Sequence, residues 1–177
     1  MGQKIWITSD THFNHANIIN YCARPFRNVV EMNATLISKW NNVVDKDDIV
    51  WHLGDFAMGG AKEIEALRAQ LNGKIYLVRG NHDTKPNDWY KERGFDRVYD
   101  KPVVVDNDVI LSHEPIDVNY GHMINFYGHV HNSAEYPTIT GSGACVCMER
   151  WEYLPLQFDR LKKNVLNMIS RFLHAEE

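Results

Sequence analysis

Apolar and amphipathic stretches alternate along the first hundred residues of the chain. Short apolar runs with strand-like composition end at polar residues, and they cover residues 4–8, 49–53 and 74–78. Apolar side chains recur at the three- to four-residue spacing of an amphipathic helix in residues 29–44, 61–71 and 87–93. Strands that alternate with helices in this way predict βαβ units and a largely parallel sheet.

Beyond about residue 100, strands follow one another with few helices between them. The expected strands cover residues 103–106, 108–111, 125–127 and 144–148. The first two flank Asn107 and predict a hairpin, whereas residues 135–143 have the composition of a turn. A broad apolar stripe predicts a closing helix over residues 158–173. We therefore expect an α/β (α+β) fold in one domain, residues 1–177, with two packed sheets flanked by helices.

The composition narrows the class of protein. A chain of 177 residues with 44% hydrophobic and 24% charged residues is typical of one globular domain rather than a disordered or coiled-coil protein. The net charge of −4 argues against binding to long nucleic acid, although a short nucleotide substrate stays compatible with it. No apolar run approaches the roughly 20 residues of a membrane span, and the stretch that begins with residues 1–6 has no long apolar run, so we expect no secretory signal. Three cysteines without a disulfide or zinc spacing agree with the cytoplasmic location that we expect.

Polar side chains with metal-binding chemistry gather where the expected strands end. Five strand ends carry His, Asp or Asn, and they read Asp10-Thr11-His12, Gly54-Asp55, Gly80-Asn81-His82-Asp83, Ser112-His113 and Gly128-His129-Val130-His131. Ligands of open α/β sheets bind outside the carboxyl ends of the strands, so these groups are expected to converge despite their separation along the chain. The two-residue spacing of Asp10 and His12, and of His129 and His131, allows both members of each pair to face one cavity.

Imidazole, carboxylate and amide ligands without thiolate suit Mn, Fe, Zn or Ni better than Mg or Ca. Seven such ligands are too many for one open catalytic ion. Divided between two ions with one carboxylate shared, they form two four-ligand sites. Two ions about 3.5 to 4 Å apart stabilise both the entering and the leaving oxygen of a phosphoryl displacement, which predicts phosphoester hydrolysis.

The ordered motifs resemble the calcineurin-like metallophosphoesterase superfamily, whose five motifs all match in order between residues 10 and 131. The stretch from Ser9 to Phe26 also looks like that of the small stand-alone phosphoesterases of bacteria and phages. The resemblance implies a four-layer α-β-β-α sandwich, the metallophosphoesterase fold, with two mixed sheets.

The resemblance also implies a role for each motif residue. One metal ion would be held by Asp10, His12, Asp55 and His131, and the other by Asp55, Asn81, His113 and His129, with manganese the favoured metal. A hydroxide shared by the two ions would attack phosphorus. His82 is not a ligand in the family, and it would protonate the leaving oxygen or stabilise the transition state.

The chain departs from the protein phosphatases of the superfamily after its second and third strands, and Asp83 stands where those enzymes carry a glutamate. Met58 and Gly59 stand where those enzymes carry the aspartate that orients the catalytic histidine and an arginine that binds phosphate. We therefore expect hydrolysis of a small phosphodiester, such as a nucleotide, rather than of phosphoproteins. A phosphomonoesterase, a non-catalytic metal-binding scaffold and a repair-type nuclease stay open as alternatives.

Contacts to substrate are expected from the loop after the first strand. Asn14, His15 and Arg27 are candidate substrate-binding residues, since a guanidinium grips phosphate with two hydrogen bonds. Asn14 or Asn17 is expected to cap the helix that follows this loop, and the start of that helix to meet a phosphate oxygen. His52 precedes the Gly54-Asp55 motif, and we expect it to support the site by packing.

Overall fold

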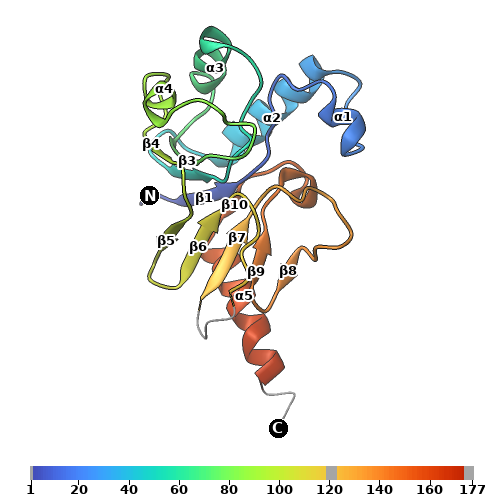
Figure 1. Ribbon diagram of the computed structural model, residues 1–177, viewed down its shortest axis with the longest axis vertical. Coiled ribbons are helices and arrows are strands. Elements are labelled where there is room, and N and C mark those ends of the chain that lie inside the picture. The colour runs from blue at the N-terminus through green and yellow to red at the C-terminus, as the bar shows by residue number, and fades with distance from the viewer. Residues whose placement is uncertain (1, 119–122, 174–177) are drawn as a thin grey trace.

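Two mixed five-stranded sheets form the centre of the computed structural model, which describes residues 2–118 and 123–173, apart from the side chains of 169–173 (Figure 1). The first sheet has the order β10 (Leu156–Gln157), β1 (Ile5–Thr8), β2 (Ile49–His52), β3 (Lys74–Val78) and β4 (Arg97–Tyr99). Strands β1 to β4 run parallel, and β10 pairs antiparallel with β1. The four parallel strands therefore end at one edge of the sheet.

The second sheet has the order β5 (Val103–Val105), β6 (Val109–Ser112), β7 (Ile124–Tyr127), β9 (Gly143–Cys145) and β8 (Ile139–Thr140). Its three central strands β6, β7 and β9 are parallel, whereas the edge strands β5 and β8 pair antiparallel with their neighbours. The β5–β6 hairpin turns at Asp106 and Asn107, both with the positive φ that suits a tight hairpin turn. The predicted hairpin is thus confirmed.

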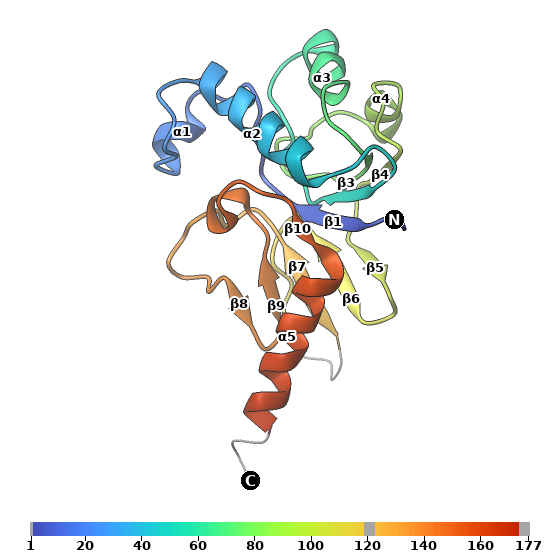
Figure 2. The ribbon, with the colours of Figure 1, turned by 180° about the vertical axis from the view of Figure 1, so that it is seen from behind.

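Five α-helices accompany the sheets in the described part of the chain: α1 (Ile18–Tyr21), α2 (Val29–Val43), α3 (Ala61–Arg68), α4 (Asn87–Lys91) and α5 (Phe158–Leu173). The Asn28 side chain caps α2 by accepting a hydrogen bond from the Glu31 N–H. Met32, Leu36 and Trp40 on one face of α2 are fully buried against the first sheet. Helices α1 to α4 all lie on the side of that sheet that faces away from the second one (Figures 1 and 2).

A second apolar core lies between the two sheets. Ile7 of β1 and Leu53, which follows β2, contribute to it together with Leu111 and Phe126 of the second sheet. Helix α5 joins this core, and its Phe158 ring meets the Phe126 ring edge-on, with the centroids 5.7 Å apart. Figure 2 shows α5 in front of the second sheet. The expected fold of two mixed sheets flanked by helices is confirmed.

Several element boundaries differ from the sequence-based expectation. The helix predicted over 61–71 ends at Arg68, whose guanidinium donates to the carbonyls of Leu71 and Gly73 and so closes the following turn. The strand predicted over 144–148 ends at Cys145, because Met148–Trp151 turns into a 3-10 helix, η1. Strand β8 lies within the stretch predicted as a turn.

The assignment of residues 1–177 to one domain stays a prediction. Among the described residues, no helix is both long and apolar enough to cross a membrane.

Candidate metal centre

The seven predicted metal ligands lie on loops that follow β1, β2, β3, β6 and β7, so both sheets contribute to one site. The loops approach one another closely enough to exchange backbone hydrogen bonds: the N–H groups of Asp10 and His12 donate to the carbonyls of Gly54 and Asp55. Gly128 lies where a Cβ would overlap the Ser9 hydroxyl and the Asp10 carboxylate. The loop after β7 therefore reaches the loop after β1 because Gly128 has no side chain.

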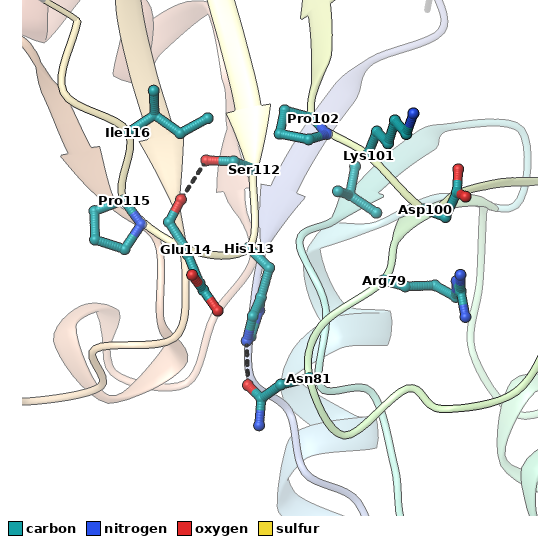
Figure 3. A pocket seen from close by; sticks show the side chains of 11 residues that line it. Arg79, Asn81, Asp100, Lys101, Pro102, Ser112, His113, Glu114, Pro115 and Ile116 are labelled. Atoms are coloured by element: carbon teal, nitrogen blue, oxygen red, sulfur yellow. Dashed lines mark hydrogen bonds between the residues drawn. The ribbon is translucent and has the colours of Figure 1, made fainter.

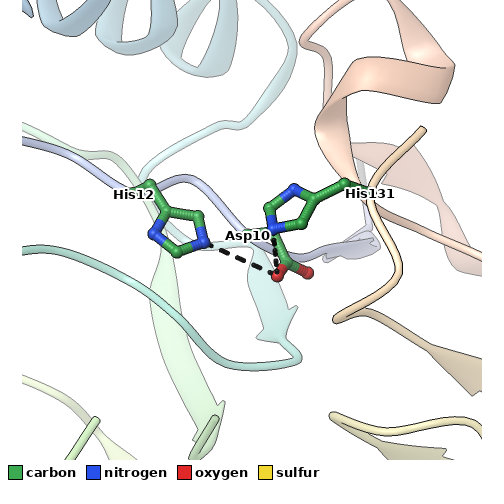
Figure 4. A group of neighbouring side chains, drawn as sticks. All are labelled: Asp10, His12 and His131. Carbon is green, nitrogen blue, oxygen red and sulfur yellow. Dashed lines mark ion pairs between the residues drawn. The ribbon is translucent and has the colours of Figure 1, made fainter. Parts of the chain in front are cut away.

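Asp10 uses its two carboxylate oxygens differently. Oδ2 accepts hydrogen bonds from the Ser9 hydroxyl at 2.5 Å, the His129 N–H at 2.9 Å and the Cys147 thiol at 3.3 Å. Oδ1 faces Nε2 of His12 at 3.8 Å and Nε2 of His131 at 3.6 Å, as Figure 4 shows. One oxygen is thus held by the protein, and the other is directed toward two imidazole nitrogens.

Asp55 stands between two groups of imidazoles. Its Oδ2 lies 3.4 Å from Nε2 of His12 and 3.6 Å from Nε2 of His113. Its Oδ1 accepts the His82 N–H at 2.9 Å. Oδ2 therefore lies beside one imidazole from a loop of each sheet.

The second group of predicted ligands consists of Asn81, His113 and His129. Asn81 Oδ1 lies 2.9 Å from His113 Nε2 and 3.0 Å from His129 Nδ1, and these two nitrogens are 3.1 Å apart. His113 Nδ1 lies 2.8 Å from the Leu53 carbonyl and donates to it, since a carbonyl only accepts. That bond leaves the lone pair of Nε2 free for a cation.

Two buried atoms at the site lack a hydrogen-bond partner among the described residues: Asp10 Oδ1 and His12 Nε2. Burying a polar atom without a partner is costly, and a divalent cation would satisfy both atoms. Asp10, His12 and His131, and likewise Asp10, Asp55 and His113, each offer ligand atoms within 4.8 Å of one another. The residues present therefore fit a bound metal ion.

The backbone at the ligands adopts an uncommon conformation. Five of the predicted ligands have positive φ, and they are Asp10 (58°), His12 (48°), Asp55 (56°), His129 (70°) and His131 (46°). Residues other than glycine rarely adopt this backbone conformation, and such residues cluster at functional sites. Five such residues at one edge support the assignment of this edge as the functional site.

The electrostatics of the site follow from burial and from the neighbouring groups. Burial raises the pKa of Asp10, but His12, His131 and His113 outweigh that effect and hold it well below its usual range. Burial lowers the pKa of His131, yet hydrogen bonds with Cys22 and Glu149 and the charge of Asp10 raise it to about 11. The site thus favours an ionised Asp10 carboxylate and a positive charge next to it.

His82 and His15 lie at the rim of the ligand group. The His82 side chain is 43% exposed, and its Nε2 is 3.9 Å from Asp55 Oδ2. The His15 ring lies 5.2 Å from His12 and 6.0 Å from His82, measured between centroids. Burial, followed by the charges of His12 and His82, lowers the pKa of His15, which favours its neutral form. Of the three candidate substrate residues, His15 is thus the one that lies beside the predicted ligands.

The other two candidate substrate residues point elsewhere. The Asn14 side chain donates to the Met58 carbonyl and accepts from Asn33 of α2. Arg27 pairs with Glu31 at 3.0 Å, its side chain is 85% exposed, and no contact among the described residues joins it to the ligand group. The capping role expected for Asn14 or Asn17 is wrong: Asn17 precedes α1 but its side chain makes no capping hydrogen bond, and Asn14 is committed to α2.

The sequence analysis assigned no role to three charged residues behind the site. Asp83 ends the Gly80-Asn81-His82-Asp83 motif. Its buried carboxylate accepts the N–H groups of Asp55, Phe56 and Gly80, which connects the loop after β2 to the loop after β3. Burial raises its pKa to about 6. Arg24 and Glu149 form a buried ion pair at 2.6 Å next to His131. No motif spacing connects residues 125 positions apart, so only the structure reveals this pair.

A cavity of about 310 Å³ opens beside Asn81 and His113 (Figure 3). Arg79 and Lys101 contribute its positive charges, and Pro102 and Pro115 belong to its apolar wall. The cavity thus adjoins the ligand group on the side of Asn81 and His113.

Sequence comparison finds a matching protein family and related proteins. A model of the calcineurin-like phosphoesterase family matches residues 3–141. The chain is 40% identical over 173 residues to the Methanocaldococcus jannaschii protein MJ1445, covering 91% of this chain and 90% of that protein. It is 41% identical over 85 residues to the Gene 66 protein of Mycobacterium phage L5, covering 44% and 39% of the two chains.

Solved structures share the fold at lower sequence identity. The protein AQ665 from Aquifex aeolicus superposes with a TM-score of 0.71 at 23% identity, covering 92% of this chain and 99% of its own. The Pseudomonas putida nuclease MPE superposes with a TM-score of 0.51 at 23% identity, covering 72% of this chain and 61% of that one.

Proposed function

The chain belongs to the calcineurin-like phosphoesterase family, and from this premise we propose that it is a cytoplasmic hydrolase of small phosphodiesters that works with two divalent metal ions. The observation that carries the proposal is the position of Asp55 between His12 and His113, at 3.4 and 3.6 Å from the same carboxylate oxygen. One shared carboxylate between two imidazole groups is the arrangement that a pair of ions needs. The three buried free cysteines fit a reducing compartment.

The proposed ligand sets follow the two groups around Asp55. Asp10, His12 and His131 would hold one ion together with Asp55, and Asn81, His113 and His129 would hold the other together with Asp55. Neutral imidazoles, carboxylates and one amide favour Mn, Fe, Zn or Ni, with manganese our preferred assignment. When bound, the two ions supply Lewis acidity at the phosphate oxygens and an activated water.

His82 is the proposed proton donor to the leaving oxygen. Its backbone N–H is fixed to Asp55 Oδ1 at 2.9 Å, while its half-exposed ring stays accessible from solvent. The His12 ring meets it edge-on with the centroids 5.3 Å apart, and the His15 ring lies behind at 6.0 Å. These neighbouring imidazoles restrict the ring in place of the aspartate that Met58 replaces.

The arginines of the first loop favour a diester over a monoester. Arg24 is fully committed to Glu149 and to two backbone carbonyls, and Arg27 pairs with Glu31. A phosphodiester carries one negative charge fewer than a monoester dianion, so it depends less on such cations. The charge of −4 argues against long nucleic acid as the substrate.

An aromatic rim supports a substrate that carries a nucleobase or another aryl group. Tyr21 of α1 is 73% exposed, and its ring lies 6.2 Å from that of His15, which in turn lies 5.2 Å from His12. The rings thus form a path outward from the proposed metal site. An exposed tyrosine offers a flat surface on which a base can stack.

Hydrolysis of bis-p-nitrophenyl phosphate, compared with p-nitrophenyl phosphate, tests the proposal directly. We expect cleavage of the diester with Mn²⁺, none after chelation, and a loss of about 10² to 10⁴ in rate for His82→Ala, the usual contribution of a general acid. Cleavage of the monoester alone would instead establish a phosphatase. A folded, Mn²⁺-loaded protein inactive on both substrates would refute catalysis and favour the scaffold alternative.

A further inference from the structure

The buried pair Arg24–Glu149 lies against both halves of the first proposed metal site. We propose that these two residues are positioning residues: Glu149 orients His131 for the metal, and Arg24 ties Glu149 to the backbone of the Asp10–His12 loop. The proposal rests on the proposed function, because it takes Asp10 and His131 as ligands.

Glu149 acts on His131 through the ring nitrogen that faces away from the proposed ion. His131 Nδ1 lies 3.0 Å from Glu149 Oε1, while Nε2 of the same ring lies 3.6 Å from Asp10 Oδ1. A carboxylate that accepts the Nδ1 proton fixes the ring orientation and leaves Nε2 as the metal-binding atom. Glu149 would thus support His131 as a ligand from the side of the ring opposite to Asp10.

Arg24 connects Glu149 with the opposite side of the site. Its Nε and Nη2 donate to Glu149 Oε1 at 2.9 and 2.6 Å. The same guanidinium donates to the carbonyl of Thr11 at 2.9 Å and to that of Asp10 at 2.7 Å. One planar group therefore holds the loop that carries Asp10 and His12 and also the carboxylate that holds His131.

The local structure explains why a rigid connection is needed here. Asp10, His12 and His131 all have positive φ, a conformation that persists only where the surroundings enforce it. The Arg24 carbonyl-binding contacts lie on the first of these loops, and Glu149 lies on η1, 18 residues after His131. The pair thus links two strained loops that are far apart in sequence.

A purely stabilising role accounts poorly for this pair. The side chains of Arg24 and Glu149 are only 0% and 3% exposed, and desolvating two charges offsets most of their attraction. Glu149 Oε2 is buried without a hydrogen-bond partner among the described residues, which adds to that cost. Apolar side chains would fill the same space at lower cost, so the contacts with the ligand loops give the pair its value.

Binding of Mn²⁺ to metal-free protein, measured by calorimetry, tests the proposal. We expect Glu149→Gln to weaken binding about 10- to 100-fold, the usual effect of removing such a partner of a metal ligand. Arg24→Lys should weaken it as well, because an ammonium cannot reproduce the fork of a guanidinium. Asp96→Asn, which breaks the ion pair with Arg68, is the matched control and should bind Mn²⁺ like the wild type.

The wild-type protein provides a second measurement that does not depend on the folding of a variant. Nitrogen NMR of ¹⁵N-histidine-labelled, Zn²⁺-loaded protein should show His131 with a proton on Nδ1 and the metal on Nε2. Wild-type Mn²⁺ affinity in folded Glu149→Gln protein, or a metal on Nδ1 of His131, would overturn the proposal. Mn²⁺ binding without phosphoester cleavage would refute the proposed function alone, whereas a wild type that binds no divalent metal would refute both.

Discussion

Asp55 holds His82 by its backbone: the His82 N–H donates to Asp55 Oδ1 at 2.9 Å, while the other oxygen of the same carboxylate faces His12 and His113. One side chain therefore sets the distance between the proposed proton donor and the proposed ions. Displacing this carboxylate would disturb metal binding and proton transfer together.

Asp55→Asn should reduce the bound divalent metal from two ions per chain to one or none, since an amide offers one oxygen and no charge. Metal analysis of desalted, Mn²⁺-loaded protein measures the content. Asp106→Asn is a close control, because Asp106 also has positive φ (51° against 56°) but lies in the β5–β6 turn. Two ions retained in Asp55→Asn would show that Asp55 is not shared between them.

Tyr21→Ala should lower kcat/KM for aryl or nucleoside phosphodiesters by about 10-fold or more, as expected from the roughly 1 to 3 kcal/mol of a base stacked on an aromatic ring. An alkyl phosphodiester should be cleaved at the wild-type rate. Tyr21→Phe retains the ring and should behave like the wild type. Equal losses on aryl and alkyl substrates would argue against stacking. Because Tyr21 is 73% exposed, its removal should hardly change stability.

His52 should make the metal-free protein sensitive to acid. The His52 ring is fully buried, its Nε2 donates to the Thr11 hydroxyl, and its Nδ1 accepts the Gly54 N–H. Burial lowers its pKa to about 3, from an ordinary value of 6.5. Between these two values the unfolded state binds a proton that the folded state refuses, so stability decreases as the pH falls through this window, by at most about 1.4 kcal/mol per pH unit.

Urea unfolding of metal-free protein between pH 4 and pH 7 measures this effect. The free energy of unfolding should fall less steeply with acidification in His52→Gln than in the wild type, because the variant lacks the titrating group while an amide can form both hydrogen bonds. Parallel pH profiles for the two proteins would contradict the linkage to His52.

Gly128→Ala should destabilise the protein by about 1 to 3 kcal/mol, the usual cost of overpacking, and weaken metal binding. The added Cβ would meet the Ser9 hydroxyl and Asp10 Oδ2, which displaces the carboxylate from its three donors. Thermal unfolding and Mn²⁺ titration measure the two effects. Gly2→Ala, where no atom lies within 4 Å of the new Cβ, should leave both unchanged.

The sequence predicted the fold well wherever periodicity was strong. Strand β3 and helix α5 have the predicted bounds, because long apolar stripes and clear polar ends define them. Strands β4 and β10 went unnoticed, since three and two residues are too short to show a period. Their pairing depends on neighbours distant in sequence, which the local pattern does not reveal.

For the candidate site, the sequence likewise predicted where the motif residues lie but not which residues support them. The motif residues Asp10, Asp55 and His113 do meet at one edge, since parallel strands deliver their carboxyl ends there. Their roles as ligands stay predictions. The placement of Arg24 and Glu149 could not be predicted, because they lie on a loop and a 3-10 helix that only the tertiary structure brings together.

The ligand loops belong to different sheets, and this has a mechanical consequence. Asp10 and Asp55 follow strands of the first sheet, and His113 and His129 follow strands of the second. Between the sheets lies an apolar core. Ions shared by these loops would cross-link the two sheets at the edge where the loops meet. Metal binding would then restrict the motion of one sheet relative to the other, so the metal content of the protein would determine the amplitude of that motion.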